Sequence, residues 1–85
     1  MHLVFVPLPI RASQGTIRFM QCTVNGRAMD LPEPCTVAVL LDRLGTKREG
    51  VAVEVNLDVI PRARHGERRL SPGDIVEVVS FVGGG

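Results

Sequence analysis

Alternating apolar and polar residues predict a β-hairpin near the start of the patterned part of the chain. In MQCTV (residues 20–24), every second residue is apolar, as in a strand with one buried side. The Asn25-Gly26 pair that follows supplies the two positive-φ positions of a type I′ turn. A return strand is therefore expected over residues 27–31, and the prolines of the next stretch, PEP, are expected to end it.

The spacing of apolar residues then changes to that of an amphipathic helix. Thr36 is a suitable N-cap for the stretch VAVLLDRL, and Gly45 lies where a left-handed residue closes a helix. One stripe at i, i+3, i+4 and i+7 is expected to face a sheet, and it comprises Val37, Leu40, Leu41 and Leu44.

Further strands are predicted after the helix. VAVEVN (residues 51–56) has its valines on one face, and Pro61 is expected to end regular pairing. An irregular crossing with a short fourth strand near residues 68–70 should follow, and then a β-turn at SPGD (residues 71–74). The last strand is IVEVVSFV (residues 75–82).

The last strand has one side that the helix is not expected to cover. Glu77 marks the wetter side, so Val76 and Val78 should face the helix. The side with Glu77 is then either partly covered or an apolar patch suited to docking a partner. The residues concerned are Ile75, Val79 and Phe81.

The predicted order β-β-α-β-β-β indicates an α+β protein with the β-grasp architecture of ubiquitin, a mixed four- to five-stranded sheet on one helix. Residues 20–82 are expected to form this domain. Residues 1–19 are expected to be an extension, either a flexible arm or an added edge strand, unless Met20 is the natural start. Residues 83–85 form a glycine tail.

Composition excludes several classes of function. A net charge of +1 and 4% aromatic residues do not suit binding to phosphate backbones or stacked bases, so no nucleic acid partner is expected. The opening stretch MHLVFVPLPI is too short to span a bilayer and has no preceding basic residue, which indicates a cytoplasmic protein with no membrane partner. Cys22 and Cys35 fit no metal-ligand spacing and are expected to be reduced thiols.

A basic segment and a histidine are the remaining candidates for chemistry. Arg62, Arg64, Arg68 and Arg69 form either a solvated loop or a docking surface for an acidic partner. His65 has no nucleophile or carboxylate that can be placed beside it, so a surface or structural role is expected.

The stretch SFVGGG, residues 80–85, has two readings. Glycine adds nothing to a core, so the run is either a frayed end or a thin tether. In the second reading, Gly83 and Gly84 carry the carboxylate of Gly85 outward as the reactive group.

Motifs in residues 20–85 resemble the ThiS-type sulfur carrier family, within the ubiquitin-like MoaD/ThiS group. The shared pieces are the VNG hairpin, the TVxxLL helix, VxVN, IPR, GD, and VEVV followed by terminal glycines. This chain has Leu57 where the family often has glycine, and His65 where many members have tryptophan.

The resemblance implies a carrier that is a substrate rather than an enzyme. An E1-like adenylyltransferase of ThiF type would use ATP to adenylate the Gly85 carboxylate, and no cofactor would be bound by the carrier itself. The resulting thiocarboxylate would donate sulfur to a ThiG-type thiazole synthase in thiamine biosynthesis. The free carrier is expected to be a monomer. From the patterns described above, the residues expected to dock its partners are Val79, Phe81, Arg62 and Arg64.

Two alternatives remain open from the sequence. One is a carrier on the same chemistry, either a MoaD-type small subunit of molybdopterin synthase or a ubiquitin-like protein modifier. The other is a β-grasp interaction module with an inert tail, which would tolerate changes at Gly84 and Gly85.

Overall fold

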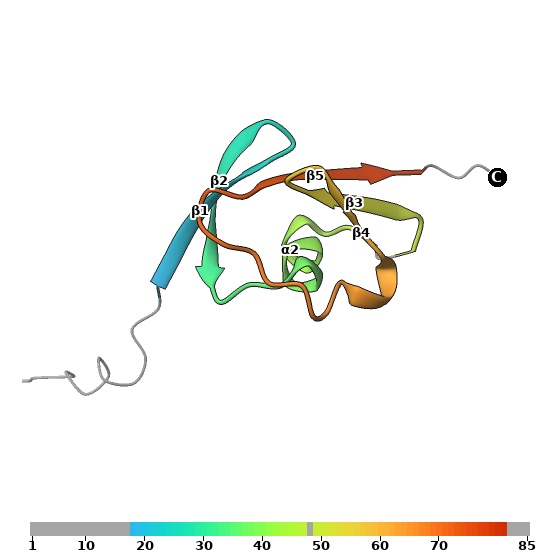
Figure 1. Ribbon diagram of the computed structural model, residues 1–85, viewed down its shortest axis with the longest axis horizontal. Helices are drawn as coiled ribbons and strands as arrows, with labels where there is room; N and C mark the ends of the chain where they lie inside the picture. The colour runs from blue at the N-terminus through green and yellow to red at the C-terminus, as the bar shows by residue number, and fades with distance from the viewer. Residues whose placement is uncertain (1–17, 48, 82–85) are drawn as a thin grey trace, which may run out of the picture.

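Five strands form one mixed sheet, and among the described residues one α-helix packs against it (Figure 1). The computed structural model describes residues 18–47 and 49–81. The strands are β1 (Arg18–Val24), β2 (Arg27–Glu33), β3 (Val51–Val55), β4 (Asp58–Ile60) and β5 (Ile75–Ser80), and the helices are α2 (Val37–Leu44) and the 3₁₀ turn η1 (Arg62–Arg64).

The strand order across the sheet is β2-β1-β5-β3-β4. Strands β1 and β5 run parallel, whereas the other neighbours are antiparallel. The last strand in the sequence therefore lies in the centre of the sheet, between the first and third. The predicted β-grasp architecture is confirmed.

The first hairpin closes as predicted, although both of its strands are longer than predicted. Asn25 and Gly26 take φ values of 50° and 82°, as a type I′ turn requires. Strand β1 begins at Arg18, and β2 continues through Pro32 to Glu33. Proline is accommodated there because β2 is an edge strand, where a missing N–H need not interrupt the ladder.

Helix α2 has both predicted caps. The Thr36 hydroxyl oxygen accepts a hydrogen bond from the Val39 amide at 3.2 Å, and Gly45 closes the helix with φ of 72°. Two further N–H groups of the first turn are satisfied by the loop after η1: Val37 donates to the carbonyl of Arg68 and Ala38 to that of His65. This loop, residues 65–74 between η1 and β5, is called the crossing loop below, and its two bonds fix the start of the helix.

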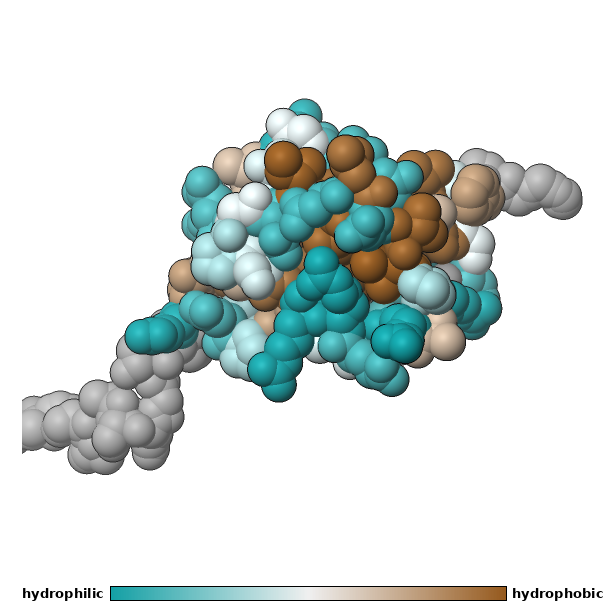
Figure 2. Space-filling model, in the orientation of Figure 1, coloured by the Kyte–Doolittle hydropathy of each residue, from teal (hydrophilic) through white to brown (hydrophobic). Residues whose placement is uncertain are grey.

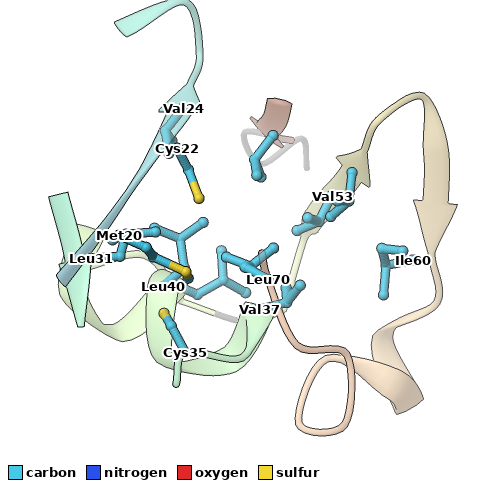
Figure 3. Packing of buried hydrophobic residues seen from close by; sticks show 13 residues of the cluster. Met20, Cys22, Val24, Leu31, Cys35, Val37, Leu40, Val53, Ile60 and Leu70 are labelled. Carbon is cyan, nitrogen blue, oxygen red and sulfur yellow. The ribbon is translucent and has the colours of Figure 1, made fainter. Parts of the chain in front are cut away.

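The helix and the sheet enclose a core built almost entirely from aliphatic and sulfur-containing side chains (Figure 3). Cys22 from β1 and Cys35 from the loop before α2 are both buried free thiols, as predicted. Burial raises the pKa of both thiols, so little of the nucleophilic thiolate is present at neutral pH. The fully enclosed aliphatic residues are Leu31, Val37, Leu40, Leu41, Val53, Val55 and Val76.

The predicted fourth strand near residues 68–70 is wrong. The fourth strand is β4, which pairs with β3 through a tight turn at Asn56 and Leu57. Both turn residues have positive φ, 53° and 76°, and leucine in that conformation gives no recognisable turn signal. Arg69 makes only an isolated bridge with Thr36.

No helix in the described ranges is both long and apolar enough to cross a bilayer.

Truncating the centre of the helix–sheet contact should destabilise the protein. Leu40 is completely buried, so Leu40→Ala should lower the free energy of unfolding by about 2–5 kcal/mol. Urea denaturation followed by circular dichroism measures this. Val39→Ala, on the partly exposed side of the same helix, is the matched control and should cost about 1 kcal/mol or less. Equal losses for the two variants would contradict the burial described.

Candidate functional site

The glycine tail predicted to carry the reactive carboxylate, Gly83–Gly85, lies outside the described residues, as does Val82. The structure does describe the root of this tail, which is the end of β5 and Phe81. The candidate site is therefore built from the tail root and the surfaces next to it.

The tail root is fixed by pairing on the β3 side of the sheet. Val51 and Ser80 are register partners, and the Phe81 amide donates to the carbonyl of Gly50 at 2.8 Å. Gly50 has φ of 70°, a conformation that side chains disfavour. The backbone is thus held up to Phe81, the last described residue before the predicted tail.

The side of the sheet away from α2 is the open face, and it carries exposed apolar residues beside the tail root. Ile75, Val79 and Phe81 are 55%, 51% and 64% exposed. Between Ile75 and Val79, Val76 is buried and Val78 half-buried, because they point to the helix side. Of the two possibilities left by the sequence, the apolar patch is the one observed. Figure 2 shows hydrophobic surface over the part of the molecule where Figure 1 places β3, β4 and β5.

We define the open-face patch as the large exposed apolar residues on this side of the sheet. Phe19 belongs to it because its neighbour Met20 points into the core, and Val59 belongs because Ile60 does. Its members are Phe19, Leu57, Val59, Ile75, Val79 and Phe81.

A shallow hollow of about 330 Å³ lies on the open face near the β3–β4 turn. Leu57, which is 87% exposed, and Ile75 supply apolar walls. Glu54 and Glu77 also line the hollow and are register partners on β3 and β5. Two like charges opposite one another repel, so the hollow favours a cationic or apolar group.

A cluster of hydrogen bonds holds the start of β5, and the sequence patterns did not predict it. The Asp74 carboxylate, nearly buried, accepts from the Ser71 amide at 2.7 Å and from the Asn56 side chain at 3.0 Å. The Asn56 side-chain oxygen in turn accepts from the Ile75 amide at 2.9 Å. The SPGD stretch was predicted only as a turn, although an Asp three residues after a Ser can bind that residue's amide.

The four arginines of the basic segment lie at two separate places on the surface. Arg62 points to the tail side, where its guanidinium lies 3.4 Å from Glu49, the residue before Gly50. Arg64, Arg68 and Arg69 instead line a separate hollow of about 510 Å³ whose other walls are Ile60, Pro61 and Glu67. The Arg62–Glu49 pair and a second pair, Arg64–Glu67, join exposed side chains and so add little to the stability of the fold.

His65 is structural, as one of the two predicted roles had it. Its side chain is 2% exposed, with Nε2 3.1 Å from the carbonyl oxygen of Ile60, and Nδ1 has no partner. Its own carbonyl accepts from Ala38, so His65 links the crossing loop to α2. Within residues 18–47 and 49–81, no three His, Cys, Asp or Glu side chains gather where they could hold a metal ion.

Comparison with known proteins gives a consistent result. A protein-family model described as the ThiS family matches residues 19–85. The chain is 29% identical over 66 residues to the sulfur carrier protein ThiS of Escherichia coli, which covers 78% of this chain and all of that protein. A crystal structure of the thiamine biosynthesis protein ThiS from Geobacter metallireducens superposes with a TM-score of 0.67 at 36% identity, covering 78% of this chain and all of the other.

Similarity also extends to a larger protein. The chain is 36% identical over 66 residues to a thiazole synthase of Paramagnetospirillum magneticum, which covers 78% of this chain. The matched part is only 20% of that synthase, so the chain spans about a fifth of the length of this relative.

Removing the Asp74 carboxylate should loosen the start of β5. Asp74→Ala leaves the Ser71 amide and the Asn56 side chain without their acceptor, which should cost about 1–3 kcal/mol of unfolding free energy. Hydrogen exchange of the Ile75 amide should accelerate, because Asn56 loses the partner that orients it. The matched control is Asp58→Ala at an exposed carboxylate, which should change stability by about 0.5 kcal/mol or less. Unchanged exchange at Ile75 in Asp74→Ala would show that the cluster does not hold the strand.

Proposed function

This chain belongs to the ThiS family, and from that membership we propose that it is a sulfur carrier protein serving thiamine biosynthesis. The observation that carries the proposal is the family match, which runs from Phe19, the second residue of β1, to Gly85 and so includes the glycine tail. The β-grasp fold shared with the Geobacter ThiS structure supports it.

The proposed reactive group is the carboxylate of Gly85, which must be free for the reaction. A carboxylate is a poor electrophile, so one of its oxygens first attacks the α-phosphate of ATP and displaces pyrophosphate. A hydrosulfide ion then attacks the carbonyl carbon, and the C–O bond to AMP breaks so that AMP leaves. The thiocarboxylic acid that remains loses its proton to give the thiocarboxylate. We assign the ATP step to an E1-like adenylyltransferase of ThiF type.

The tail composition suits entry into a partner's active site. Gly83 and Gly84 have no side chains, so they can pass through a narrow channel and lie close to the partner's backbone. Phe81 is already held by its hydrogen bond to Gly50, so docking of a partner at the tail root carries no entropic cost for ordering this residue's backbone.

The surfaces beside the tail root are the proposed docking sites. Val79 and Phe81 expose apolar area on the same side of the sheet, and a partner covering them would gain from their burial. Arg62 lies near the tail root through its pair with Glu49, so an acidic partner residue could reach it. Arg64 lies farther along, at the separate basic hollow.

A ThiG-type thiazole synthase is the proposed acceptor of the sulfur. Support comes from the thiazole synthase of Paramagnetospirillum magneticum, which contains a stretch similar to this chain. A carrier-like segment within the same polypeptide as the synthase would keep donor and acceptor at high effective concentration.

Incubating the protein with ATP, a sulfur source and the cognate E1-like enzyme should convert Gly85 to a thiocarboxylate. Intact-mass spectrometry should show a gain equal to the difference between one sulfur and one oxygen atom, and fragmentation should localise it to Gly85. The matched control lacks Gly84 and Gly85 and should show no gain while keeping the wild-type circular dichroism spectrum. A gain of the same size in the shortened protein would overturn the role given to the tail.

A charge placed in the open-face patch should weaken partner docking. Val79→Asp would put a carboxylate into the proposed contact, and the rate of adenylation at limiting carrier should fall about tenfold or more. Val39→Asp, at a partly exposed valine on the helix side, is the matched control and should react at nearly the wild-type rate. Equal rates for the two variants would move the docking site away from the open face.

A further inference from the structure

The open-face patch gathers six large exposed apolar residues of the described chain on one side of the sheet. Its members come from β1, the β3–β4 turn, β4 and β5, so the exposed apolar area runs across most of the sheet. Polar residues such as Gln21, Glu54 and Glu77 lie between them on the same face. Exposed apolar residues gathered on one face and bordered by polar ones are typical of an interaction surface.

The same chain contains an apolar segment, residues 3–10, to which the proposed function assigns no role. Residues 3–10 read LVFVPLPI, without one charged or hydrogen-bonding side chain. The family match begins only at residue 19, so these residues lie outside the part of the chain that matches the family. Two prolines at alternate positions favour an extended polyproline II backbone.

The segment has the length and connection needed to reach the patch. In polyproline II form, residues 3–10 would span about 22 Å. On the open face, β1 runs from Phe19 to Thr23, and β5 continues in the same direction from Ile75, the register partner of Thr23, to Val79. These two stretches together are about 26 Å long. Residues 12–17, ASQGTI, connect the segment to β1 and can extend about 20 Å, enough to reverse direction.

Charge also favours this pairing. Residues 1–17 contain no Asp or Glu and one arginine, Arg11, whereas the open face presents Glu54 and Glu77 around its hollow. In polyproline II geometry every third residue shares a side, which groups Phe5, Leu8 and Arg11. That side would offer two apolar groups and one cation to a surface that is apolar with two carboxylates.

We propose that residues 3–10 dock on the open-face patch of their own chain and mask it in the free protein. A partner that uses this face must then displace the segment, which makes it an internal competitor for docking. Only this last consequence rests on the proposed function; the masking itself does not.

Nuclear magnetic resonance on the full-length protein tests the masking without any partner. The wild type should show nuclear Overhauser effects between the Phe5 ring and the methyl groups of Ile75 or Val79. The double variant Phe5→Asp/Leu8→Asp should lose them, and the amide signals of Ile75, Glu77 and Val79 should shift while that of Val39 on the helix side stays in place. The matched control Ser13→Asp adds a carboxylate in the connector and should keep the contacts.

Two outcomes would overturn the proposal. One is the absence of these contacts in the wild type, with open-face amides that do not respond to the double variant. The other is that the contacts appear only between chains, in a mixture of isotope-labelled and unlabelled protein, because the occupant would then be a second copy. Since no adenylating enzyme is present, either result leaves the sulfur-carrier proposal to be judged by its own mass measurement.

Discussion

The central position of β5 is the constraint on which the rest of the structure depends. This strand pairs with β1 on one side and β3 on the other, so it joins the hairpin half of the sheet to the second half. Because β5 comes last in the sequence, the chain after β4 must cross from one edge of the sheet back to its centre. The crossing loop makes backbone hydrogen bonds along its whole length. It accepts from the start of α2, Leu70 donates to Cys35 just before that helix, and Gly73 donates to Gln21 of β1. Asp74 and Asn56 then set where β5 begins.

Local signals predicted the elements that form within a few residues of one another. The Asn25-Gly26 turn, the Thr36 cap and the Gly45 closure each depend on the conformational preferences of one or two residues, and all three are confirmed. The apolar side of β5 was also predictable, because alternation alone separates Val76 from Ile75 and Val79. The β-grasp order followed from combining these elements.

Features that depend on distant residues were not predictable in the same way. The β3–β4 hairpin closes through Leu57, whose left-handed backbone is strained, and no local pattern marks it. The Asn56 side chain bonds to Asp74, 18 positions away, and the two become neighbours only once β3 and β5 have paired. The basic segment likewise looked uniform, but Arg62 lies by the tail root whereas Arg64, Arg68 and Arg69 surround a separate hollow.

The pairing of β5 also decides how the domain resists force. Its two neighbours lie alongside it, so a partner that grips the residues after Phe81 and pulls along the strand loads both ladders in shear. In shear, several backbone hydrogen bonds must break together, whereas an edge strand pulled sideways loses them one at a time. The bonds from Thr23 and Asn25 to β5 and its entry, and the five register pairs with β3, share that load. The domain should therefore stay folded when a partner pulls on the end of the chain along the direction of β5.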